Sequence, residues 1–168
     1  NHEPEHAVTW HQMTVEIDAG DILKQQRVPI SPYDTSVSLN VKCAQAALGA
    51  FESLVHDLKD GSETPVAQDL SKRTYNAQNR RPDDACVIDF NQNVEEISAL
   101  ARALDFGDYD NPLGTLKFAC GDTLYMVKEL SVTSSKQNAA PGSIIEVNKD
   151  NISIAAGNGV VKLSGICD

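Results

Sequence analysis

Apolar residues recur at alternating spacings of four and three between residues 37 and 58. The set is Val37, Val41, Ala44, Leu48, Phe51, Val55 and Leu58. This period places them on one face of an α-helix of about six turns. Asp34 or Thr35 can cap the amino end of the helix, and Gly61 can end it. The pattern predicts one long helix whose apolar stripe must be buried against a sheet or other helices.

Two β-strands are predicted before this helix. Residues 8–15 alternate between two faces of an extended chain. One of these faces carries Thr9, His11, Met13 and Val15. The second strand covers residues 23–30 and stops at Pro29 and Pro32. Residues 16–20, Glu-Ile-Asp-Ala-Gly, form a tight acidic turn between the strands, because Asp can bond its own backbone and Gly can adopt a positive φ.

Residues 1–75 thus predict an incomplete domain. Two strands alone give a marginally stable ribbon, which is too little to bury the stripe of the long helix. We expect this segment to be the second half of a domain whose first half lies outside the chain. Residues 61–86 are polar and rich in turn-forming residues, which is typical of an interdomain linker.

β-Structure is predicted to dominate the second region, residues 76–168. Residues 88–90 form a short strand, and Asn93 with Glu96 forms a capping box for a helix that Gly107 stops. Five further strands are expected at residues 115–119, 123–132, 143–147, 151–156 and 160–163. Short strands at hairpin spacing indicate a small barrel. The predicted fold class is α/β followed by β-rich α+β.

The chain of 168 residues carries a formal net charge of −10. The charge is spread evenly, since residues 1–75 hold 6 Lys and Arg against 11 Asp and Glu, and residues 76–168 hold 8 against 13. Neither region has the basic surface that binding to a phosphate backbone requires. Nucleic acid is therefore disfavoured as the main partner.

No apolar run reaches the length of a membrane span, and the first residues do not resemble a secretory signal. The four cysteines lie far apart and form no C-x-x-C pair. Reduced thiols in a cytoplasmic protein fit this spacing best. His2, His6 and His56 have no partner at metal-ligand spacing, so no metal site is expected.

A specific motif surrounds the acidic turn. The string V-T-x-H at residues 8–11, then Met13, then I-D-A-G-D-I-L at residues 17–23, resembles the end of the catalytic domain of folate-dependent formyltransferases. That family includes methionyl-tRNA formyltransferases, sugar N-formyltransferases and the formylation domains of modular synthetases. R-P-D-D from residue 81, N-P-L-G at 111–114 and P-G-S-I-I-E-V at 141–147 are similar to its C-terminal domain.

The resemblance implies a fold and a domain organisation. Residues 1–75 would be the C-terminal part of the catalytic domain, with two strands and a long helix of a Rossmann-like fold. Residues 76–168 would hold the linker and a small, OB-like C-terminal barrel. The first half of the catalytic domain, with its parallel sheet, would precede the chain.

The resemblance also implies chemistry. Members of the family transfer the formyl group of 10-formyltetrahydrofolate to an amine, here of an aminoacyl substrate, possibly carrier-bound, or of an amino sugar, possibly a nucleotide sugar. Asp18 matches the catalytic aspartate. Ile17, Ala19 and Gly20 would form the loop that meets the folate, and Met13 would line the same cavity. Gly20 would allow the ligand a close approach to the backbone.

The family also uses an Asn-x-His pair, which this chain does not contain. The chain alone is therefore expected to be inactive. His11 precedes Asp18 on a face that can point inward, and it is either a catalytic partner of Asp18 or a packed, hydrogen-bonded histidine. Two other functions stay open: hydrolysis of formyltetrahydrofolate, with water in place of the amine, and a non-catalytic docking module for a carrier protein.

Overall fold

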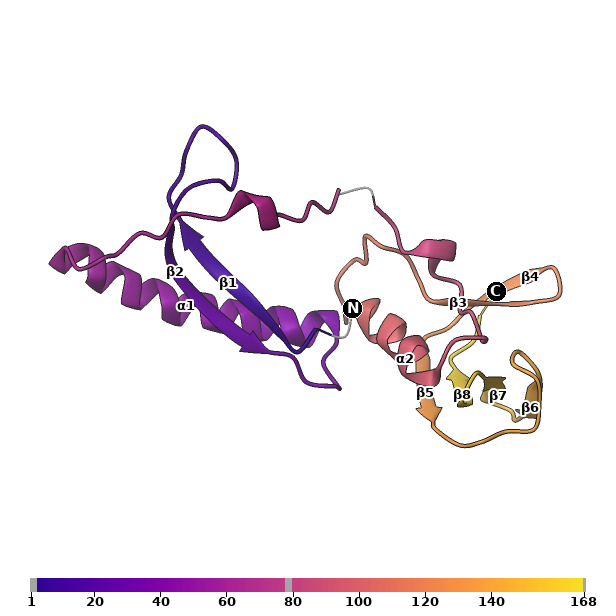
Figure 1. The fold of residues 1–168 in the computed structure, drawn as a ribbon. Coiled ribbons are helices and arrows are strands. Elements are labelled where there is room, and N and C mark those ends of the chain that lie inside the picture. Colours follow the sequence, from indigo (N-terminus) through magenta and orange to yellow (C-terminus); the bar gives the residue numbers. More distant parts are fainter. Residues whose placement is uncertain (1–2, 78–79, 168) are drawn as a thin grey trace. The chain divides into compact units, whose positions relative to one another are not determined.

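The computed structural model describes residues 3–77 and 80–167. The chain divides into two compact units, Asn1–Gln78 and Asn79–Asp168 (Figure 1). The first unit contains strands β1 (Glu5–His11) and β2 (Ile22–Pro29), helix α1 (Ser36–Asp60) and a short 3₁₀ turn, η1 (Leu70–Lys72). No helix in the described parts of the chain is long and apolar enough to cross a membrane.

β1 and β2 form an antiparallel hairpin with a long connecting loop. Glu5 lies opposite Pro29, and the register shifts between Trp10 and His11 at the loop end. The predicted second strand is confirmed, but the prediction that the first strand continues to Val15 is wrong. The ladder closes where the Gln12 amide donates to the Asp21 carbonyl at 2.9 Å. Residues 13–20 then leave the sheet, so their alternating pattern does not describe two faces of a strand.

Helix α1 lies along the hairpin, as Figure 1 shows. The indole of Trp10 stacks at a tilt on Phe51, with ring centroids 4.9 Å apart. Its Nε1–H donates to the Ala47 carbonyl at 3.1 Å. Ala50 and Leu54 follow Ala47 at spacings of three and four and are buried. Small side chains on this face let the hairpin approach the helix closely.

The predicted apolar stripe lies next to this packed face and meets it at Phe51, which belongs to the stripe and contacts Trp10. Val41, Leu48, Val55 and Leu58 are between 47% and 68% exposed. The bounds of the helix and its end at Gly61 are confirmed. The hairpin covers the alanine-rich face and contacts Phe51 at the edge of the stripe, and the other large side chains of the stripe stay about half exposed within the described residues of the first unit.

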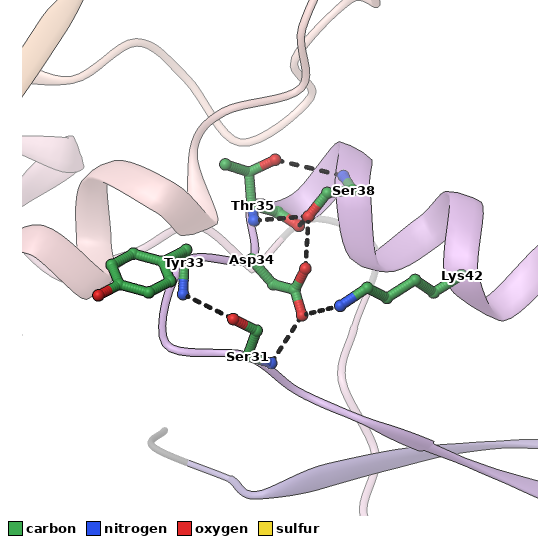
Figure 2. Close-up of polar contacts among 6 residues, drawn as sticks. All are labelled: Ser31, Tyr33, Asp34, Thr35, Ser38 and Lys42. Atoms are coloured by element: carbon green, nitrogen blue, oxygen red, sulfur yellow. Dashed lines mark hydrogen bonds and ion pairs between the residues drawn. The ribbon is translucent and has the colours of Figure 1, made fainter.

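The amino end of α1 is held by the polar network in Figure 2. Thr35 is the N-cap, as predicted, and it forms a reciprocal capping box with Ser38. The Asp34 carboxylate beside it is only 7% exposed. It accepts from the Lys42 ammonium at 2.7 Å, the Ser31 amide at 2.7 Å and the Ser38 hydroxyl at 2.8 Å.

These donors stabilise the charged form of Asp34. Lys42 contributes most, and together with Ser31 and Ser38 it lowers the pKa of Asp34 from 3.8 to about 2. The folded state therefore keeps this carboxylate deprotonated at pH values where the unfolded chain has already bound a proton. The resulting stabilisation is complete above pH 3.8 and is lost as the pH falls through about 2.

We expect the free energy of unfolding to fall between about pH 4 and pH 2 because of Asp34. Asp34→Asn should lower the stability at neutral pH and flatten this part of the profile. Urea unfolding of the chain at several pH values measures both effects. The matched control is Asp60→Asn, at an exposed position at the other end of the helix, which should keep the wild-type slope. Equal acid slopes for wild type and Asp34→Asn would contradict the assignment.

The second unit is a small antiparallel α+β structure. It contains η2 (Asp83–Cys86), α2 (Val94–Ala103), β3 (Lys117–Cys120), β4 (Thr123–Met126), β5 (Glu129–Thr133), β6 (Ile144–Val147), β7 (Asn151–Ala156) and β8 (Gly159–Ser164). β3 and β4 pair with each other, and the other four strands form a sheet in the order β5-β8-β7-β6. The antiparallel α+β character is confirmed, while closure into an OB-like barrel stays a prediction.

The core of this unit lies between α2 and the sheet. The largest of its fully buried side chains come from η2, α2 and β8, and they are Ile97, Leu163, Val94, Val161 and Cys86. α2 packs against β5 and β8. The predicted strand at residues 88–90 is wrong. Ile88 is buried in this core and donates its amide to the Lys117 carbonyl at 2.8 Å, but the segment forms no ladder.

Two further local predictions in this unit need correction. The expected strand at residues 123–132 is two strands, because the β-structure is interrupted between Met126 and Glu129. Asn93 is the N-cap of α2, but its side chain makes no capping bond. The Val94 amide instead donates to the side-chain oxygen of Asn158, in the β7–β8 turn, at 2.8 Å. The helix is therefore capped by a residue distant in sequence.

Candidate functional site

The loop at residues 12–21, between β1 and β2, carries most of the predicted site residues. It is closed at its base by the bond from the Gln12 amide to the Asp21 carbonyl. Within the loop, the Thr14 hydroxyl donates to the Glu16 carbonyl at 2.7 Å. Asp18 has a φ of 59°. This left-handed backbone is uncommon outside glycine, and Asp is one of the residues that tolerate it best.

The structure brings His11 and Asp18 together. The Nε2 atom of His11 lies 3.6 Å from Oδ1 of Asp18. The Nδ1 atom of His11 lies 2.9 Å from the Gln12 carbonyl. Because a carbonyl oxygen can only accept, Nδ1 carries a proton, and Nε2 faces the carboxylate. A second proton on Nε2 turns this contact into an ion pair.

The two side chains differ in exposure. The imidazole of His11 is 28% exposed and the carboxylate of Asp18 is 72% exposed. The pair thus stands at the surface of the first unit, with the ring partly covered and the carboxylate open. An electrostatic interaction in this setting is weakened by water.

Gly20 is buried, and its lack of a side chain is required by the loop itself. A Cβ atom there would lie 1.9 Å from the carbonyl oxygen of Gln12. The sequence interpretation explained this glycine by a close approach of ligand. The structure shows that the obstacle to a larger residue is the backbone at the base of the loop.

Met13 and Ile17 lie on the open side of this loop. They are 97% and 76% exposed, and Val15 between them is fully exposed. Ala19 is half-buried beside Gly20. The loop therefore carries both the polar pair and large apolar side chains that are exposed. Within the described residues, no group of three His, Cys, Asp or Glu side chains is arranged to hold a metal ion.

Gln68 is a residue of this site that the sequence interpretation missed. It follows α1 in the segment expected to be a plain linker. Its side-chain Nε2 donates to the carbonyls of Asp18 at 3.0 Å and of Gly20 at 2.5 Å. No motif signals this contact, because it depends on how the segment returns along the hairpin.

The second unit has a separate cavity of about 490 Å³ next to the end of α2. Polar and aromatic side chains line it, among them Arg102, Phe106, Tyr109, Asn111 and Lys128. None of the predicted site residues belongs to this unit.

Comparison with known proteins gives the family. Residues 81–167 match the C-terminal domain family of formyl transferases. The chain belongs to the formyltransferase family. This match covers the second unit, and it confirms the resemblance noted in the sequence.

Solved structures of similar fold cover both units. HypX from Aquifex aeolicus in complex with tetrahydrofolic acid matches with a TM-score of 0.68 and 14% identity, over 98% of this chain and 27% of that one. An N-formyltransferase from Helicobacter canadensis, in complex with folinic acid and dTDP-3-aminofucose, matches with a TM-score of 0.66 and 18% identity, over 98% of this chain and 57% of that one. A 4-N formyltransferase from Francisella tularensis matches with a TM-score of 0.53 and 24% identity, over 67% of this chain and 45% of that one.

These likenesses establish a shared fold. The chain spans about a quarter of HypX and just over half of the Helicobacter enzyme. The structural match extends through the hairpin, the 12–21 loop and α1, since it covers nearly the whole chain. The first unit thus has the fold of the corresponding part of formyltransferases, although the family match by sequence lies in the second.

Substitution of Gly20 tests the closure of the loop. Gly20→Ala should destabilise the first unit by about 1–3 kcal/mol, because the added methyl meets backbone that cannot move aside. The matched control is Gly49→Ala in α1, where nothing lies within 4 Å of the new Cβ. That change should stabilise the helix by up to about 1 kcal/mol. Urea unfolding measures both; a neutral Gly20→Ala would contradict the loop geometry.

Proposed function

We propose that this chain is the C-terminal part of an N-formyltransferase that moves a formyl group from 10-formyltetrahydrofolate to an amine. The acceptor is an aminoacyl group, carried by a partner protein, or an amino sugar attached to a nucleotide. The observation that supports this most strongly is the 3.6 Å contact of His11 with Asp18, on a loop held by its own backbone, in a chain of the formyltransferase family.

The proposed reaction begins when the amine nitrogen forms a bond to the formyl carbon. The carbonyl electrons move to oxygen, and the tetrahedral intermediate then collapses as the bond from carbon to the folate nitrogen breaks. Tetrahydrofolate leaves with the proton that the amine gives up. Fixed hydrogen-bond donors that stabilise such an oxyanion contribute roughly 3–4 kcal/mol each.

We assign the proton transfer to Asp18. Its carboxylate accepts the proton of the attacking amine, directly or through water, and it orients the ring of His11. The Nδ1–H of His11 is already committed to the Gln12 carbonyl, so the ring presents Nε2 to this site. This geometry favours a catalytic His11 over one that serves packing alone.

The proposed folate site is the rim of the same loop. Met13 and Ile17 would pack against the flat pterin ring, and the backbone at Ala19 and Gly20 would bond its polar edge. Large exposed apolar side chains on a short polar loop are costly to leave in water. A bound aromatic ligand gives them a partner.

We further propose that a Rossmann-like half-domain completes the site. The exposed stripe of α1, which includes Val41, Leu48 and Val55, has the length and composition of a helix face that packs on a sheet. The partner half would supply the Asn-x-His pair of the family and would exclude water from Asp18. The 168-residue chain alone should therefore be inactive.

Substitution of Asp18 tests the proposed reaction. In the full-length protein that contains this chain, Asp18→Asn should lower kcat for formyl transfer by about 100-fold or more, since it removes the proton acceptor. Asp21→Asn, which removes a carboxylate from the same loop, is the matched control and should change kcat little.

Product analysis in the same assay separates the alternatives. Formylated amine supports the transferase, whereas free formate without formylated amine would point to a hydrolase. Full activity of Asp18→Asn would remove Asp18 from the reaction.

A further inference from the structure

We infer that Gln68 is a positioning residue for Asp18. It holds the backbone on both sides of Ala19 and so keeps the Asp18 carboxylate beside His11. The catalytic consequence of this contact rests on the proposed function, while the structural consequence does not.

The segment after α1 returns along the hairpin and carries Gln68 to the loop. Val66 and Ile22 exchange two backbone hydrogen bonds, of 2.8 and 2.9 Å, so residue 66 extends the sheet by one bridge. An extended chain advances about 3.3 Å per residue. Two residues beyond the bridge, the half-buried Gln68 side chain therefore meets the 12–21 loop.

The amide of Gln68 is used fully as a donor. Its NH₂ group has two hydrogens, and its nitrogen lies within bonding distance of two carbonyl oxygens, those of Asp18 and Gly20. These carbonyls lie two residues apart, on either side of the tightest part of the loop. One side chain thus joins both ends of the segment that presents the carboxylate.

This support is needed because the backbone of Asp18 is strained. A φ of 59° is uncommon for a residue other than glycine, and such a conformation persists where its surroundings determine it. Gly20 fixes one side of the loop against Gln12, and the Gln68 amide fixes the other. Arg73 approaches Glu16 at 4.0 Å, but this exposed pair contributes little.

Two variants remove the clamp, by which we mean the two hydrogen bonds from the Gln68 amide to the loop, while keeping the size of the side chain. Gln68→Met has no donor, and Gln68→Glu places a carboxylate against two carbonyl oxygens. The matched control is Gln25→Met on β2, where the lost bond goes to the Thr9 hydroxyl within the hairpin. Thermal unfolding first confirms that each variant is folded. One folded Gln68 variant is enough for the two measurements that follow.

The structural readout is the mobility of the loop. Backbone ¹⁵N order parameters of residues 17–20 should fall from about 0.85 to below about 0.6 in the Gln68 variants, and stay unchanged in Gln25→Met. Unchanged order parameters in a folded Gln68 variant would overturn the inference, whatever the activity of the protein.

The kinetic readout uses the full-length protein. A misplaced Asp18 should lower kcat by about 10- to 100-fold and leave KM for the amine nearly unchanged, because Gln68 holds the proton acceptor and does not bind the amine. Increased mobility with unchanged kcat would overturn the positioning role. Increased mobility in a protein whose wild type transfers no formyl group would support the clamp and refute the proposed function.

Discussion

The close contact of two backbone segments governs the first unit. Gly20 lies so near the Gln12 carbonyl that an added Cβ atom would overlap it, and the hydrogen bond from Gln12 to Asp21 closes the loop at the same place. Residues 13–20 are thereby confined to a short loop outside the sheet. This constraint, with the positive φ of Asp18, turns the carboxylate toward His11 at the end of β1.

Helix α1 gives this loop a stable base. One face, with Ala47, Ala50 and Leu54, lets the hairpin pack closely. The Trp10 indole joins the hairpin to α1 by a hydrogen bond to Ala47 and a tilted ring contact with Phe51. The adjacent face keeps large apolar side chains exposed. A helix with two apolar faces is typical of the middle layer of a larger domain. In the proposed function, one half-domain would cover both this stripe and the Asp18 carboxylate.

Much of this arrangement could be predicted from the sequence, for local reasons. The Thr35 cap, the Gly61 end and the second strand follow from side-chain and backbone preferences of a few adjacent residues. Contacts between residues that are distant in sequence, which form when the chain folds back on itself, could not be predicted. Gln68 reaches the loop from 48 residues away, and Asn158 caps α2 from 64 residues away. The buried face of α1 was also missed, because small alanines give a weaker pattern than Val, Leu and Phe.

The most direct test of the central claim is an NMR titration of the full-length protein with folinic acid, observing the His11 ring and residues 13–20. We expect saturable changes in the His11 imidazole signals and in the loop amides, together with loss of exposure at Met13 and Ile17. Saturable binding that leaves all of these signals unchanged would contradict the account, since the loop would then lie outside the folate site.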